Sequence, residues 1–459
     1  MGLHTTATKA PETSPVTPAV SRGYAWLVFA LSFGLLLSDY MSRQVLNAVF
    51  PQLKAEWLLS DSKLGSLSGI VALMVGVLTF PLSLLADRWG RAKCLVIAAV
   101  VWSLATLGCA VSAGYGQMFV GRFIVGVGEA AYGSVGIAVV LSVFPVRLRA
   151  TLSGAFMAGG SFGSVLGVSV GGVIGQVYGW RWAFGVMGAF GLVLAVAYGL
   201  VVTEKKLGPA ASKHSGSSGE RAPLGPQLRR LFSSVSVICA YIGSGAQMFI
   251  TMALLAWMPS FLNRYYDMAT AKAGLAAGGF ALISGTGMIL CGVVADRLSE
   301  RAGNRRKWTV GIACSLGSLV LLMTAFQLPT GPLQLVLIGA GTLVAGGTAG
   351  PAAAMVARLT PAAIAATAMA TLTLANSLLG LAPGPAVTGM LADRWGLLGA
   401  LRVIPLVALA GCVAFAIGRF SYEKICAAWG CPPTRPPTPW SIHHEPHPVA
   451  DDRNSPWTA

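Results

Sequence analysis

The chain has 459 residues, of which 55% are hydrophobic and only 10% are charged. Soluble domains usually carry about 25% charged residues, so this composition excludes an ordinary soluble protein. The net charge of +16 comes from basic residues dispersed over predicted loops. That dispersal favours contact with anionic lipid and argues against nucleic-acid binding.

In chain order, a polar tail at residues 1–23 precedes a series of apolar runs, each long enough to cross a bilayer as a helix. The first six spans are predicted at about 24–45, 63–86, 94–113, 117–144, 151–176 and 182–203. Residues 204–231 are basic and rich in Gly, Ser and Pro, which is typical of a flexible cytoplasmic linker. Six further spans are predicted at about 232–262, 270–296, 308–327, 331–358, 361–392 and 398–420.

These twelve spans predict an all-α polytopic membrane protein built from two six-helix bundles, residues 24–203 and 232–420. Roughly 23 of the 32 Lys and Arg residues fall on the side of the N-terminus. Because basic loops stay inside, both termini are predicted to be cytoplasmic, with the protein in the cell (inner) membrane. We expect the chain to act as a monomer.

The C-terminal tail, residues 421–459, is predicted to lack a fixed structure. It contains Cys426, Cys431, His443 and His447 at a spacing that approaches a zinc-finger pattern. The segment between the Cys and His pairs is "PPTRPPTPWSI", which lacks the apolar helix that such a finger packs onto its metal. We therefore expect neither a metal nor another bound cofactor, and zinc binding by this tail is the alternative.

A short motif recurs after corresponding spans of the two halves. It appears as "SLLADRWGRAK" at 83–93 and "GVVADRLSERAGNRRK" at 292–307, with an echo "GMLADRWG" at 389–396. Such recurrence indicates an internal duplication, a common way to build transporters. With "RFIVGVG" at 122–128, the motif resembles the hallmarks of the major facilitator superfamily.

Within that superfamily, "DYMSRQVLNAVFPQLKAEW", "GEAAYGS" and "GWRWAF" resemble spinster-like transporters and anion:cation symporters. The resemblance implies two bundles that rock about a central cavity, opened and closed by loop charges. The conformational gate would comprise Asp87, Arg88, Arg91, Arg149 and Asp296. The alternative is that these loop charges only set the topology.

Four charged residues lie well inside predicted spans, away from their ends, and ionisable groups in such places are usually functional. Asp39 and Arg43 are four residues apart on one helix face, and Arg122 and Glu129 share a face of the fourth span. We predict that Asp39 and Glu129 couple transport to protons and that Arg43 and Arg122 belong to a substrate-binding charge cluster. Arg122 is expected to lie close enough to choose between the carboxylates. The alternatives are a permanent Asp39–Arg122 pair that only fastens two helices, and an Arg43 that reaches out to water.

The second half offers uncharged polar groups instead. Gln247, which shares a face with Ser244 and Thr251, and Asn376 are the candidates for substrate contact. Each could equally bond to a neighbouring helix.

We therefore predict a secondary active transporter that moves a small organic anion with protons by alternating access. Its partners would be that small molecule and the lipid bilayer. No nucleotide-binding motif or catalytic constellation is evident, so an enzyme is not expected. The alternatives are an exporter of amphipathic, lysolipid-like or drug-like molecules and a non-transporting sensor or scaffold with the same fold.

Overall fold

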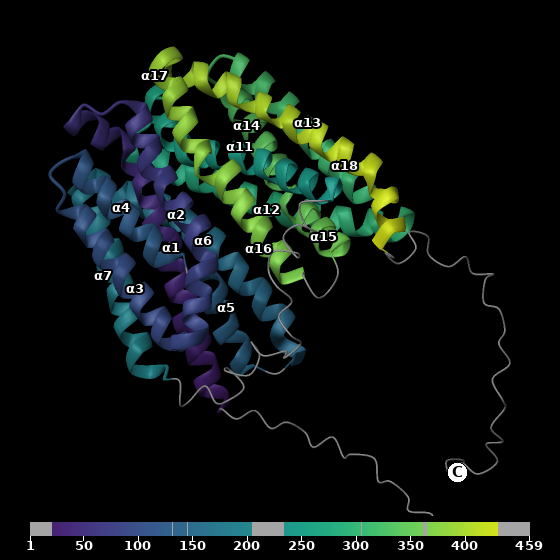
Figure 1. Ribbon diagram of the computed structural model, residues 1–459. Coiled ribbons are helices and arrows are strands. Elements are labelled where there is room, and N and C mark those ends of the chain that lie inside the picture. Colours follow the sequence, from purple (N-terminus) through teal and green to yellow (C-terminus); the bar gives the residue numbers. More distant parts are fainter. Residues whose placement is uncertain are drawn as a thin grey trace, which may run out of the picture.

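The computed structural model of the chain describes residues 21–130, 132–144, 146–203, 234–303, 305–360 and 365–429, and every regular element in these ranges is helical. Two helical bundles lie side by side (Figure 1). The helices of the first bundle are α1 (Arg22–Trp57), α2 (Asp61–Trp89), α3 (Arg91–Ala110), α4 (Tyr115–Glu129), α5 (Tyr132–Val143), α6 (Val146–Tyr178) and α7 (Trp180–Val201). Those of the second are α11 (Val235–Tyr265), α12 (Thr270–Ala302), α13 (Arg305–Gln327), α14 (Pro332–Gly346), α15 (Ala349–Leu359), α16 (Ala365–Asn376), the π-helical turn η2 (Ser377–Leu381), α17 (Pro383–Val403), the short η3 (Ile404–Leu406) and α18 (Val407–Trp429).

Among the described residues, ten helical segments are long and apolar enough to cross a membrane. Helices α4 and α5 are each too short, but together they cover the predicted fourth span. The last segment, Thr367–Tyr422, covers two predicted spans and bends at Gly396, whose φ of 73° is readily adopted only by glycine. With these two adjustments the helices match the twelve predicted spans, and the predicted all-α membrane fold is confirmed.

Two predicted spans end well before the helices that contain them. Helix α1 continues to Trp57, whereas the first span was predicted to end at about residue 45. Helix α18 continues to Trp429, whereas the last span was predicted to end at residue 420. The rest of the tail, with Cys431, His443 and His447, lies outside the described residues, as do the side chain of Cys426, residues 1–20 and residues 204–233.

Close backbone packing explains the glycine-rich fifth span. Gly163, Gly167 and Gly171 recur every four residues on α6 and face α1. A side chain added at Gly167 would place its Cβ 2.8 Å from the Cα atom of Met41. Small residues at this spacing let two helices approach closely within a membrane, where no hydrophobic force draws helices together.

The two bundles touch at the end of the molecule where α1 and α11 end, which we call the distal end. There the rings of Phe50 and Trp257 lie 5.2 Å apart, and the backbone N–H of Ala271 donates to Oε1 of Gln176 at 2.8 Å. Gly65 on α2 lies directly against the backbone of α17. The distal end is therefore closed by direct contact between the bundles.

Candidate functional site

A cluster of charged side chains is buried where α1 packs against α4. Asp39, Arg122 and Glu129 are only 1–2% exposed. Two acids and two bases balance one another here, which reduces the cost of burying charge away from water. The structure thus brings together all four charged residues that the sequence predicted to cluster.

Arg43 is the residue that joins the two carboxylates. Its Nε lies 2.7 Å from Oε2 of Glu129, and its Nη2 lies 3.3 Å and 3.4 Å from the two carboxylate oxygens of Asp39. The Arg43 side chain is 18% exposed, while those of Asp39 and Glu129 are at most 3% exposed. A water-borne ligand would therefore reach the guanidinium before either acid.

Ser42 completes the coordination of Glu129. Its Oγ lies 2.9 Å from Oε1 of Glu129 and 2.8 Å from the carbonyl oxygen of Asp39. A hydroxyl has a single hydrogen, so it donates to one of these oxygens at a time. If it turns toward the carbonyl, its lone pairs face a carboxyl group that could then carry a proton. Sequence reasoning did not include Ser42 among the site residues, although it stands between the two charged positions of α1.

Arg122 has different partners from those expected. Its Nη1 donates to the carbonyl of Ser42 at 2.8 Å, its Nη2 to the carbonyl of Arg43 at 3.2 Å and its Nε to the carbonyl of Leu67 at 3.4 Å. Carbonyl groups of α1 and α2 thus bind the guanidinium that was expected to choose between the carboxylates. Arg122 fixes α4 against α1 and α2, and Arg43 takes the place between the acids.

Both bundles carry a break in the corresponding span near this depth. In the first bundle α4 ends at Glu129 and α5 begins at Tyr132; in the second α14 ends at Gly346 and α15 begins at Ala349. Interrupted spans at corresponding positions of two repeats are a recognised mark of a transporter's binding site. The break after Glu129 therefore points to the charged cluster as the functional centre.

Gln247 lies away from this centre. It is fully buried, and its Oε1 accepts from Ser318 Oγ of α13 at 3.2 Å. A Cβ added at Gly411 of α18 would lie 3.5 Å from its Nε2. The polar face of α11 that carries Gln247 thus turns into the second bundle, against α13 and α18. In this conformation Gln247 contacts its own bundle, and substrate contact stays a prediction; helical spacing predicts which residues share a face but not where that face points.

Asn376, the other polar candidate of the second bundle, has an amide oxygen without a partner among the described residues. It is half-buried at the end of α16, where the π-helical turn η2 begins. Its Oδ1 is buried and has no hydrogen-bond partner among the described residues. Such π-turns often occur at functional sites, and an unpaired buried oxygen is costly unless something else binds it.

The predicted gate residues are only partly described. The side chains of Asp87 and Arg149 lie outside the described residues, Arg88 is exposed, and Arg91 begins α3. Asp296 accepts from Nζ of Lys307 at 2.7 Å. That pair joins α12 to α13 within one bundle.

A second set of charges, absent from the sequence prediction, holds the distal end closed. Arg264 on α11 makes a two-pronged contact with Asp61 on α2, with N–O distances of 2.7 Å and 2.8 Å, and Lys54 lies 2.6 Å from the same carboxylate. Asp393 on α17 accepts from the backbone N–H groups of Asp61 and Ser62 at 2.7 Å and 3.0 Å. A carboxylate there also meets the positive end of the α2 dipole. The only available signal was the third Ala-Asp-Arg motif, which contains Asp393.

The chain is similar in sequence to several membrane transport proteins. Protein spinster homolog 1 of Bos taurus is 28% identical over 332 residues, covering 68% of this chain and 62% of the relative. The sphingosine-1-phosphate transporter SPNS2 of Danio rerio is 25% identical, with 68% and 63% covered, and the probable L-galactonate transporter of Escherichia coli (strain K12) is 26% identical, with 58% and 61% covered. The chain thus spans less than two thirds of the length of these relatives.

The fold is shared with solved transporters. The crystal structure of a bacterial homologue of the human lysosomal transporter Spinster, in an inward-facing and unoccupied conformation, superposes with a TM-score of 0.80 at 18% identity, covering 88% of this chain and 99% of that one. The sequence pattern of the Major Facilitator Superfamily matches residues 32–385. With its duplicated bundles and the matching family pattern, this chain belongs to the Major Facilitator Superfamily, and it is similar to members of the spinster type.

Proposed function

We propose that the protein is a proton-coupled secondary active transporter that moves a small organic anion by alternating access. The observation that carries this proposal is Arg43, a partly exposed cation held between two buried carboxylates. A guanidinium is suited to bind a carboxylate or phosphate group, because its planar fork matches two oxygens at once.

The coupling follows from competition for that guanidinium. An entering anion draws Arg43 toward itself and weakens its contacts with Asp39 and Glu129. A buried carboxylate that loses its cation is strongly disfavoured, and taking up a proton relieves the cost. Ser42 is positioned to contact Glu129 in either protonation state. Substrate and proton therefore bind together and leave together.

The direction of opening depends on sidedness. With both termini cytoplasmic, as the distribution of basic residues predicts, the distal end faces outward. The Asp61–Arg264 contact would then be an outer gate, closed in this structure. Transport requires this gate to break while contacts form at the opposite end, where Asp87, Arg91 and Arg149 lie. The proton gradient would supply the energy, in the inner membrane and without a bound cofactor.

A second candidate is export of an amphipathic, lysolipid-like anion. It is favoured by the similarity to SPNS2 of Danio rerio, whose name states that it transports sphingosine-1-phosphate, whereas the similarity to the L-galactonate transporter favours a small acid. Both candidates place an anionic group on Arg43. They differ in whether the body of the substrate is polar or apolar.

The test begins with a substrate. A ligand at about 100 times its Kd should stabilise the purified protein by roughly 2.7 kcal/mol, so a melting screen of organic acids and lysolipids will find it. The shift should disappear in Arg43→Ala. Hits among lysolipids alone would establish the second candidate in place of the first.

Flux in proteoliposomes then tests the coupling. Glu129→Gln and Asp39→Asn should abolish accumulation driven by a pH gradient but keep part of the substrate exchange. Glu56→Gln is the matched control, because Glu56 is a paired carboxylate of α1 outside the cluster, bound by Arg181 at 2.8 Å. Unchanged pH dependence in both cluster variants would refute proton coupling, and absence of any flux in the wild-type protein would favour a sensor.

A further inference from the structure

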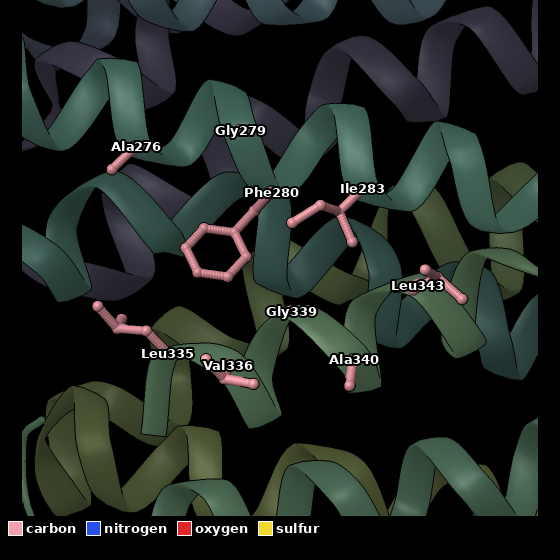
Figure 2. A pocket seen from close by; sticks show the side chains of 9 residues that line it. All are labelled: Ala276, Gly279, Phe280, Ile283, Leu335, Val336, Gly339, Ala340 and Leu343. Atoms are coloured by element: carbon pink, nitrogen blue, oxygen red, sulfur yellow. The ribbon is translucent and has the colours of Figure 1, made fainter. Parts of the chain in front are cut away.

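An apolar groove lies between α12 and α14, on the second bundle and apart from the charged cluster. Figure 2 shows Phe280 and Ile283 of α12 facing Leu335 and Val336 of α14. The groove has a volume of about 500 Å³, which is within the range of ligand sites. Neighbouring apolar side chains on the same helices are strongly exposed, among them Leu275 at 56% and Leu333 at 62%. This face of the bundle is therefore built to lie in lipid.

Two glycines create the space in the groove. Gly279 and Gly339 lie on its two walls (Figure 2). A Cβ added at Gly279 would meet nothing within 4 Å, and one at Gly339 would lie 3.6 Å or more from its neighbours. Neither glycine is required for close helix packing or for an unusual backbone angle. Because these two residues have no side chains, the groove has free space along both walls.

A polar pocket of about 490 Å³ adjoins the groove at the distal end. The two share Leu335, and the pocket is lined by Tyr265 at the end of α11 and by the loops after α11 and α13, which contribute Asp267 and Thr330. Asp267 is exposed, has a left-handed φ of 50°, and has no ion-pair or hydrogen-bond partner among the described residues. An acidic group without a described cation thus stands at the mouth of an apolar groove.

The dimensions suit one leaflet of a bilayer. From Leu335 to Leu343 the groove follows α14 for about 12 Å, close to half of a ~30 Å hydrocarbon core. We propose that the groove and its polar pocket bind a membrane lipid of the distal leaflet, with an acyl chain along α12 and α14 and an ammonium-bearing headgroup beside Asp267. The charge of Asp267 selects a cationic end group, and the apolar walls select a chain. This site is independent of the transport function proposed above.

Native mass spectrometry of the full-length protein tests the proposal. The probes are phosphatidylethanolamine, whose headgroup ends in an ammonium, and phosphatidylglycerol with the same acyl chains, whose headgroup does not. The wild-type protein should bind the former about three- to fivefold more tightly, as expected for a solvent-accessible ion pair. Asp267→Asn should remove this preference, and Gly279→Leu should weaken binding of both lipids about tenfold by filling the groove.

Gly292→Leu is the matched control. Gly292 lies on the same helix with nothing within 4 Å of an added Cβ, but it is about 33 Å from the distal start of α12, at the level of the other leaflet. It should bind both lipids as the wild-type protein does. Equal binding of the two lipids by the wild-type protein, or unchanged binding in Gly279→Leu, would overturn the proposal. Asp267→Asn changes an exposed side chain and so tests the headgroup contact even if a groove variant does not fold.

Discussion

Arg43 is the cation that contacts both carboxylates of the site, because the guanidinium of Arg122 is occupied by backbone carbonyls. A single guanidinium therefore faces two carboxylates, and the cluster is neutral only when Arg122 is counted with it. Competition for one cation is more sensitive to an entering anion than two separate ion pairs would be. The two arginines thus differ in role: Arg43 contacts the carboxylates, and Arg122 binds backbone carbonyls.

Replacing Arg43 by Gln should destabilise the protein by about 3–5 kcal/mol at neutral pH, because two buried carboxylates lose their cation. The difference in unfolding free energy between Arg43→Gln and the wild-type protein should be smaller at acidic pH, where the carboxyl groups can be neutral. The double variant Arg43→Gln/Glu129→Gln should recover part of the stability, which thermal unfolding of the detergent-solubilised protein will measure. A double variant less stable than Arg43→Gln would show that the ion pair between Arg43 and Glu129 does not contribute as described.

At the scale of elements, glycines determine how closely helices of different bundles can approach. On α2, a Cβ at Gly65 would collide with the backbone carbonyl of Pro385, and one at Gly69 would lie 2.5 Å from the carbonyl of Ala382. Backbone cannot yield as a flexible side chain can. The contact between α2 and α17 therefore requires these glycines whenever the distal end is closed.

Gly65→Val should consequently hold the distal end open. A cysteine placed at Ala386, which lies 3.6 Å from the Cβ position of Gly69 across this contact, would report opening through faster alkylation in a background without accessible native cysteines. Gly108→Val should leave the rate unchanged, because nothing lies within 4 Å of its added Cβ. Equal alkylation rates in the two variants would contradict a steric role for Gly65.

At the scale of the whole molecule, an ion pair can affect the opening of the distal end only if it joins the two bundles. Arg264 and Asp61 join α11 to α2, whereas Arg181 and Glu56 join α7 to α1 within the first bundle. Both contacts lie at the distal end and have N–O distances below 3 Å. Only the first must break when the bundles separate.

Arg264→Gln should therefore shift the equilibrium toward distal opening and change the transport rate, while Arg181→Gln should not. Exposed pairs contribute about 0.2–1 kcal/mol, but the two-pronged and half-buried contact of Arg264 should exceed this, giving a severalfold change. Substrate exchange in proteoliposomes measures the rate in both variants. An equal response to the two substitutions would mean that the Asp61–Arg264 contact has no special part in opening.

Much of this architecture was predictable from sequence because membrane helices obey simple rules of length and hydropathy. A run of apolar residues must be helical in lipid, since no water is there to satisfy the backbone. The same cost of burying charge made Asp39, Arg43, Arg122 and Glu129 stand out, and the four do lie together. The least accurate boundaries were the ends of α1 and α18, where each helix continues past the end of the predicted apolar span.

The sequence by itself therefore determined the class of the protein, its duplicated halves and the membership of its charged cluster. Only the tertiary structure decided which arginine faces the acids, because helical spacing gives the residues that share a face but not the rotation of one helix against the next. For the same reason, the sequence could not show that Gln247 contacts α13 of its own bundle. Asp61, Arg264 and Asp393 were also missed, since they lie far apart in the chain and meet only because the two bundles close at the distal end.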